Sequence, residues 1–285
     1  MWWNYTPIKT NWNLLIRWQA SLFLIFLMPF HKSMTFITER LNTACKKRIL
    51  FLNPMGTTSQ YWLQNLQIHN SFENFELVFL DYPGYASVDF YYVESLQKLA
   101  REIADDLQQL NSKETIVIGF SYGGNVAICL TEYLSIHKMV LIGTNPYIHK
   151  NEIKFYEYLE NSLKQNGLYD FSTSLLNFCY NRKEKESNPF LHLTLYASLR
   201  LNVNQLALEQ QLDHLKNNVG DLVLQKNTLI PLIIIGEDDE TVFEDIIDRY
   251  NVLFKDIIFK EFSDAGHFVL DYNQDSIEII KEYIN

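Results

Sequence analysis

Short, continuous apolar runs recur along the chain from residue 48 onward. Six of them have the length of buried strands, and helix-compatible stretches separate most of them. The predicted strands cover residues 48–52, 76–80, 115–118, 139–142, 229–235 and 257–262. Continuous rather than alternating apolar positions are typical of strands buried on both faces of a parallel sheet. The pattern therefore predicts an α/β fold, with a mostly parallel sheet flanked by helices.

Helical periodicity is clearest between residues 93 and 110. Leu96, Leu99, Ile103 and Leu107 recur there at intervals of three and four residues, which places them on one face of a helix. Residues 60–69 and 274–283 are also predicted to be helical, and the second of these segments closes the chain.

The alternation of strand and helix breaks once, between residues 146 and 227. This stretch is rich in Tyr, Phe and Leu and reads as several helices. It contains nine Lys or Arg and nine Asp or Glu, so the net charge of −10 that the chain carries lies outside it. We therefore expect a helical insertion, 146–227, within a body formed by residues 34–145 and 228–285.

Residues 1–33 differ in composition from the rest of the chain. They contain three basic residues, no Asp or Glu, four of the five tryptophans, and an apolar run at 22–28. That run is shorter than the roughly 20 residues of a membrane-spanning helix, and no small-residue cleavage site follows it. The composition suits a segment that lies on a membrane surface. Two alternatives stay open, a helix packed on the domain and upstream sequence before a start at Met34.

Net charge and cysteine content exclude some classes of function. A net charge of −10 argues against a broad nucleic-acid-binding surface. Three widely spaced cysteines, Cys45, Cys129 and Cys179, form neither a disulfide framework nor a zinc pattern. They are compatible with a reducing compartment. We expect a cytoplasmic protein, with membrane contact through residues 1–33 if that segment is an anchor.

The most informative motif joins the third predicted strand to a helix-compatible stretch. Residues 119–124 read Gly-Phe-Ser-Tyr-Gly-Gly, and G-x-S-x-G between a strand and a helix is typical of a nucleophile elbow. The glycines allow strand and helix to pass closely, while the serine sits on a strained turn that exposes its hydroxyl. The alternative is a glycine-rich turn in which Ser121 only caps the helix. We predict that Ser121 is a catalytic nucleophile.

This elbow resembles that of the α/β-hydrolase fold superfamily, and the resemblance covers about residues 48–285. The family places its serine, its acid and its histidine in that order along the chain. His267 follows the last predicted strand in a turn similar to the family's small-Gly-His-Phe sequence. The resemblance therefore implies that His267 is the general base.

The acid should follow the fifth predicted strand, where residues 236–242 offer four carboxylates. The family pattern Gly-x-x-Asp-x-x-Val falls on Gly236, Asp239 and Val242. The resemblance thus implies Asp239, with Asp238 as the alternative. The other carboxylates read as a solvated acidic helix start.

An acyl-transfer site also needs hydrogen-bond donors for the developing oxyanion. The resemblance implies the backbone N–H of Tyr122 as the first. For the second, this chain has Asn53-Pro54 where many relatives have His-Gly, and proline has no N–H. The N–H of Met55 is then the expected donor. Residues 81–87 resemble a family turn, with Ala86 replacing its second glycine, and we interpret them as structural.

The insertion resembles the helical cap of many α/β-hydrolases. The resemblance implies a serine hydrolase of carboxylic esters or thioesters that have an apolar acyl chain, either as small molecules or bound to a carrier protein. It implies no metal and no organic cofactor. Two alternatives remain open. One is an acyltransferase, in which an alcohol, amine or thiol replaces water. The other is a non-catalytic ligand-binding protein of the same fold.

Overall fold

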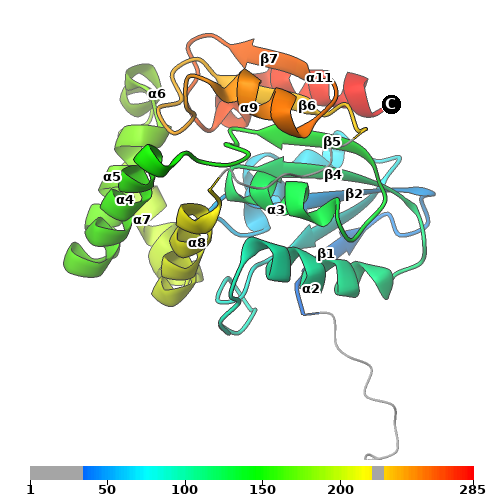
Figure 1. The fold of residues 1–285 in the computed structure, drawn as a ribbon, viewed down its shortest axis with the longest axis horizontal. Helices are drawn as coiled ribbons and strands as arrows, with labels where there is room; N and C mark the ends of the chain where they lie inside the picture. Colours follow the sequence, from blue (N-terminus) through cyan, green and yellow to red (C-terminus); the bar gives the residue numbers. More distant parts are fainter. Residues whose placement is uncertain (1–34, 220–227) are drawn as a thin grey trace, which may run out of the picture. The chain divides into compact units, whose positions relative to one another are not determined.

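The computed structural model describes residues 35–219 and 228–285, so the predicted membrane-surface segment 1–33 lies outside the described residues. A sheet of seven strands forms the centre of the described chain, in the order β1-β3-β2-β4-β5-β6-β7 (Figure 1). Only β1 is antiparallel to its neighbour, β3. The strands are β1 (Ile37–Leu41), β2 (Lys47–Leu52), β3 (Glu76–Leu80), β4 (Glu114–Phe120), β5 (Ile136–Ile142), β6 (Leu232–Gly236) and β7 (Ile258–Phe262). The predicted α/β fold with a mostly parallel sheet is confirmed.

The six predicted strands correspond to β2 through β7, and the sequence analysis missed β1. Its sequence, Ile-Thr-Glu-Arg-Leu, contains two charged residues, and its side chains are half-buried or exposed. It pairs only with β3 and forms an edge of the sheet. An edge strand does not need a continuous apolar run, so β1 lacks the signal that reveals the inner strands.

Side chains of the inner strands alternate between two apolar cores. Leu50, Val117 and Leu141 contribute to one core, whereas Ile49, Ile118 and Val140 contribute to the other. The first core also contains residues of α2 (Leu96–Gln108), α3 (Tyr122–Leu130) and α9 (Ile246–Leu253). The second contains residues of η1 (Tyr61–Asn65), η2 (Ile68–Asn70), α10 (Val269–Tyr272) and α11 (Gln274–Ile284). Both faces of the sheet are therefore covered, as the continuous apolar runs require.

Two predicted helices differ from those observed. The helix expected over 93–110 begins at Leu96, because the Ser95 hydroxyl accepts a hydrogen bond from the N–H of Lys98 and caps it. The helix expected over 60–69 is wrong as a single element. A short π-helix and a 3₁₀ turn take its place, separated by Gln67 in the left-handed region at φ 48°.

The predicted helical insertion lies between β5 and β6. Its helices are η3 (Lys150–Glu152), α4 (Ile153–Asn166), α5 (Leu168–Cys179), α6 (Arg182–Ser187), α7 (Leu191–Asn202) and α8 (Gln205–Asn217). In Figure 1 they stand together beside the sheet, apart from the helices that cover its faces. We call this group the cap and the remaining described residues the body. Among the described helices none is both long and apolar enough to cross a membrane.

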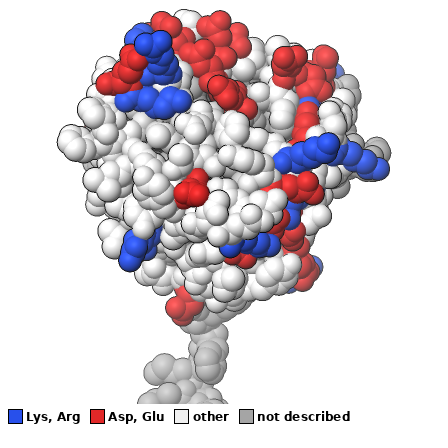
Figure 2. All heavy atoms as spheres, turned by 90° about the vertical axis from the view of Figure 1, so that its left-hand side faces the viewer, with Lys and Arg blue, Asp and Glu red and all other residues white. Residues whose placement is uncertain are grey.

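Figure 2 views the molecule from the side of the cap. Much of this face is uncharged, and acidic side chains gather toward its upper end and one side. Several large apolar residues of the cap are exposed, among them Tyr158, Tyr169, Phe190 and Leu193.

Candidate active site

Ser121 occupies the turn between β4 and α3 in a conformation that few non-glycine residues adopt. Its φ is 52° and its ψ is −117°. Its N–H donates to the carbonyl of Ile142 on the neighbouring strand at 2.8 Å, which holds the strained turn in place. The side chain makes no capping hydrogen bond to α3. The hydroxyl is therefore not used to cap the helix, unlike in the alternative interpretation of the motif.

The glycines around Ser121 are required by close backbone contacts. A Cβ atom on Gly123 would lie 2.3 Å from the carbonyl oxygen of Leu52, and one on Gly119 would lie 2.6 Å from the carbonyl oxygen of Gly123. Any larger residue would push α3 away from β2 and β4. This packing sets the position of Ser121 at the carboxyl edge of the sheet.

His267 and Asp239 form a buried hydrogen-bonded pair. Nδ1 of His267 lies 2.7 Å from Oδ2 of Asp239, and both residues are buried. A carboxylate only accepts hydrogen bonds, so the pairing places a proton on Nδ1 and leaves Nε2 unprotonated in the neutral ring. Asp238, the alternative acid, is exposed and instead accepts a hydrogen bond from Nδ2 of Asn181.

The hydroxyl of Thr241 lies between these two groups, and the sequence analysis missed it. Oγ1 of Thr241 is 2.6 Å from Oδ1 of Asp239 and 2.9 Å from Nδ1 of His267. The N–H of Thr241 also donates to Asp239 Oδ1, at 2.9 Å. A signal was present, because an Asp side chain commonly accepts from the backbone two residues later.

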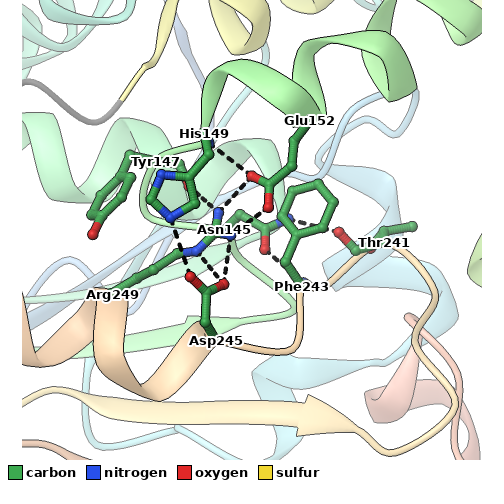
Figure 3. A network of polar contacts seen from close by, with 8 residues as sticks. All are labelled: Asn145, Tyr147, His149, Glu152, Thr241, Phe243, Asp245 and Arg249. Carbon is green, nitrogen blue, oxygen red and sulfur yellow. Dashed lines mark hydrogen bonds and ion pairs between the residues drawn. The ribbon is translucent and has the colours of Figure 1, made fainter.

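Asn145 holds the loop that carries Asp239 and Thr241, and Figure 3 shows its contacts. Its Nδ2 donates to the carbonyl of Thr241 at 2.7 Å, and its Oδ1 accepts from the N–H of Phe243 at 3.1 Å. Its own carbonyl accepts from Nδ2 of Asn125, on the helix that follows Ser121. Asn145 thus joins the loop that carries Asp239, which we call the acid loop, to α3. Asn145 is the last residue before the predicted insertion, and the sequence analysis gave it no role.

A charged cluster next to this loop joins the cap to the body (Figure 3). Arg249 of α9, which is 1% exposed, donates to Oε2 of Glu152 at 2.8 Å and to Oδ1 of Asp245 at 2.6 Å. It also donates to the carbonyl of Tyr147, at 2.9 Å, and its guanidinium lies over the ring of Phe243. His149 reaches Asp245 from the cap side. We call the side chains of Arg249, Glu152, Asp245 and His149 the Arg249 network.

The turn that carries His267 is attached to the cap as well. The N–H of His267 donates to the carbonyl of Cys179 at 2.8 Å, and the N–H of Gly266 donates to Oε1 of Glu184 at 2.9 Å. Burial raises the pKa of Glu184, although the backbone N–H donors of Gly266 and Asn181 oppose that rise. A Cβ atom on Gly266 would lie 2.7 Å from the carbonyl oxygen of Cys179, so the turn cannot approach the cap this closely with a larger residue.

All of the predicted site residues except Asp239 line one cavity between body and cap. Ser121, His267, Tyr122 and Met55 lie on its wall, and Thr241 does so too. Its empty space, counted together with the solvent at its mouth, is about 730 Å³. The cap lines it with mostly apolar side chains: Phe155, Tyr156, Leu159, Leu175, Phe178, Cys179, Tyr180, Leu195 and Leu215. Within the described residues no hydrogen bond joins Ser121 to His267, and such contacts often tighten only when substrate is bound.

The described part of the chain has no cluster of side chains suited to binding a metal. Within 35–219 and 228–285, no three His, Cys, Asp or Glu side chains are placed so that they could hold a metal ion.

Several known proteins are similar to this chain in sequence or in structure. An uncharacterized hydrolase of Bacillus subtilis, YugF, is 21% identical over 239 residues, which cover 74% of this chain and 80% of that protein. The solved esterase EaEST of Exiguobacterium antarcticum is 18% identical with a TM-score of 0.73, covering 88% of this chain and 98% of that one. A thermophilic esterase of Thermogutta terrifontis is 13% identical with a TM-score of 0.71, covering 86% and 91%. The family described as the alpha/beta hydrolase fold matches residues 47–274. On the strength of that match and of the fold, this chain belongs to the α/β-hydrolase fold family.

Proposed function

We propose that this chain is a serine hydrolase that cleaves carboxylic esters or thioesters through an acyl-enzyme. One observation carries the proposal: His267, which is paired with the buried Asp239, lines the same cavity as Ser121, and Ser121 stands on a strained turn with its hydroxyl free of the helix. A ligand-binding role would need none of these three together. The two solved esterases of the same fold support ester chemistry.

In the proposed reaction, Nε2 of His267 takes the proton of Ser121 Oγ while that oxygen attacks the carbonyl carbon of the substrate. The imidazolium that forms is stabilised by Asp239. It then gives the proton to the departing alcohol or thiol, leaving an acyl-serine. Water, deprotonated by His267, attacks the acyl-serine, and Ser121 leaves as its alcohol with the proton from His267.

The tetrahedral oxyanion would be held by the backbone N–H groups of Tyr122 and Met55. Both residues line the cavity beside Ser121. Tyr122 is the first residue of α3, and the first N–H groups of a helix have no partner within it. The positive end of the helix dipole adds to the stabilisation of a negative charge at this point.

We further propose that residues 146–227 act as a cap domain that selects an apolar acyl chain, whether free or attached to a carrier protein. Phe155, Leu159, Leu175, Phe178 and Leu195 face the cavity from the cap helices. A cavity between two packed units that is lined by apolar side chains is a common place for such a ligand.

Hydrolysis of p-nitrophenyl esters from acetyl to decanoyl, by the wild type and three variants, tests these proposals. We expect kcat/KM to rise roughly threefold to fourfold per methylene until the cavity is filled, because each buried CH₂ contributes about 0.8 kcal/mol. Ser121→Ala should lower kcat by about 10⁴–10⁶-fold. Asp239→Asn should cost up to about 10⁴-fold, because it favours the wrong imidazole tautomer. Asp238→Asn is the matched control and should stay close to wild type.

Each arm has a result that contradicts it. Activity of Ser121→Ala within tenfold of wild type would remove Ser121 as the nucleophile. A severe loss in Asp238→Asn together with a mild one in Asp239→Asn would reverse the acid assignment. Equal rates on acetyl and octanoyl esters would show that the cap does not select the acyl chain.

A further inference from the structure

Two buried tyrosines hold the loop that carries Met55. The hydroxyl of Tyr82 donates to the carbonyl of Asn53 at 3.0 Å, and the hydroxyl of Tyr85 accepts from the N–H of Gly56 at 3.1 Å. These anchors stand on either side of Met55, whose N–H is a proposed oxyanion donor. The direction of that N–H therefore depends on both hydroxyl groups.

The hydroxyl of Tyr85 is in turn oriented by the cap. It donates to Oε1 of Gln211, on α8, at 2.5 Å. A phenol has one proton, so this bond fixes the hydroxyl with its lone pairs toward Gly56. Tyr85 is 0% exposed and Gln211 is 1% exposed, so water does not compete for either group.

Gln211 has a feature that packing alone does not explain. Within the described residues its Nε2 is buried and has no hydrogen-bond partner. A buried amide with an unpaired donor is unfavourable, and an apolar side chain of the same shape would avoid the penalty. What glutamine supplies here is its carbonyl, the acceptor for Tyr85.

The other proposed oxyanion donor, Tyr122, is attached to the same helix. Its hydroxyl lies 2.8 Å from Nδ1 of His214 on α8, and Nε2 of His214 lies 2.7 Å from the carbonyl of Val93. A carbonyl only accepts, so Nε2 carries the proton and Nδ1 accepts from the Tyr122 hydroxyl. We call Tyr85, Gln211, Tyr122 and His214 the α8 network.

We infer that α8 positions the oxyanion hole, with Tyr85 as the positioning residue between Gln211 and the loop that carries Met55. The inference rests on the proposed hydrolase function, and it gives the cap a second role besides lining the cavity. None of these side chains lies among the residues assigned to proton transfer. They act through the direction of the two backbone N–H groups.

Tyr85→Phe is the primary test, measured on the best ester of the panel. Removal of an oxyanion donor typically costs about 10²–10³-fold in kcat, so misdirection of one should lower kcat by about 10–100-fold. KM should stay within about threefold, because the oxyanion exists only in the transition state. Inhibition by an alkyl boronic acid should weaken by a similar factor as kcat, because its serine adduct places an oxygen where the oxyanion forms.

Tyr283→Phe is the matched control. Its hydroxyl also accepts from a backbone N–H, that of Met139, and donates to an acceptor, the carbonyl of Ile230, but it belongs to α11 at the other end of the sheet. It should leave kcat and boronic acid inhibition unchanged. Gln211→Leu keeps the size of the side chain and removes the acceptor, so it should lower kcat in the same way and decides the question if Tyr85→Phe does not fold.

The outcomes separate this inference from the proposed function. If the wild type hydrolyses the esters and Ser121→Ala does not, the function stands. In that case, an unchanged kcat in folded Tyr85→Phe, or an equal loss in Tyr283→Phe, overturns the inference alone. A change confined to KM also overturns it. A wild type without activity on any ester overturns both.

Discussion

Two polar networks join the cap to the body, and they differ in charge and in how much of each is buried. The Arg249 network pairs a guanidinium with two carboxylates beside the acid loop. The α8 network is built from neutral groups and reaches both parts of the proposed oxyanion hole, the loop that carries Met55 and the first residue of α3. A buried charge that loses its partner is costly, whereas a neutral hydrogen bond contributes little net stability. We therefore expect the charged network to matter mainly for stability and the neutral one mainly for turnover.

The largest effect should come from Arg249→Met. The substitution keeps an apolar stem beside Tyr147 and Phe243 but removes the cationic partner of Glu152 and Asp245, which keep their contacts with His149. We expect the free energy of unfolding to fall by about 3 kcal/mol, at the lower end for a broken buried pair because Asp245 is 43% exposed and can be hydrated. Urea denaturation at pH 7 measures it.

A second substitution sharpens this prediction. Glu152→Leu added to Arg249→Met removes the carboxylate that was left behind, so the double variant should regain part of the stability. If Arg249→Met lowers stability no more than Gln211→Leu does, the contrast between the two networks is wrong.

An intermediate effect is expected from pH, through the one histidine of the α8 network. Burial lowers the pKa of His214 below its ordinary value of 6.5, against the carbonyl of Val93 and the charge of Asp213, which raise it. A histidine whose pKa is lower when folded contributes stability that is fully present above pH 6.5 and is lost as pH falls below it. The slope reaches at most about 1.4 kcal/mol per pH unit.

His214→Gln removes this titration while keeping a donor for the carbonyl of Val93. Between pH 8 and pH 5, the free energy of unfolding should fall less in the variant than in the wild type. The remaining titratable groups contribute equally in both proteins. Identical losses in the two proteins would show that His214 does not titrate against folding.

The smallest effect is expected from His149→Gln, at the exposed edge of the Arg249 network. His149 and Asp245 are 49% and 43% exposed, and even full ion pairs in such positions contribute only roughly 0–1 kcal/mol. We expect a change below about 0.5 kcal/mol in urea denaturation. A loss comparable to that of Arg249→Met would mean that charge, rather than burial, decides the energetics of this network.

The sequence by itself determined the parts of this protein that depend on local pattern. Strands β2 through β6 contain continuous apolar runs, and the inner strands are buried on both faces, whereas the edge strand β7 includes Lys260 and Glu261. The elbow at Ser121 is visible because its glycines must stand at fixed positions within one turn. The assignment of Asp239 and His267 came from resemblance, and the structure places these two side chains in contact.

Tertiary structure alone decided the contacts between distant segments. Arg249 and Glu152 are 97 positions apart, and Tyr85 and Gln211 are 126 apart. Polar side chains of these types commonly lie on a protein surface, so the sequence gives no sign that they meet. The packing of the cap against the body brings them together. The edge strand β1 was missed for a related reason. It is held by its hydrogen-bonded pairing with β3, and its own sequence lacks the apolar run from which a strand is predicted. Apolar periodicity records which face of an element is buried, but not which distant side chain it meets there.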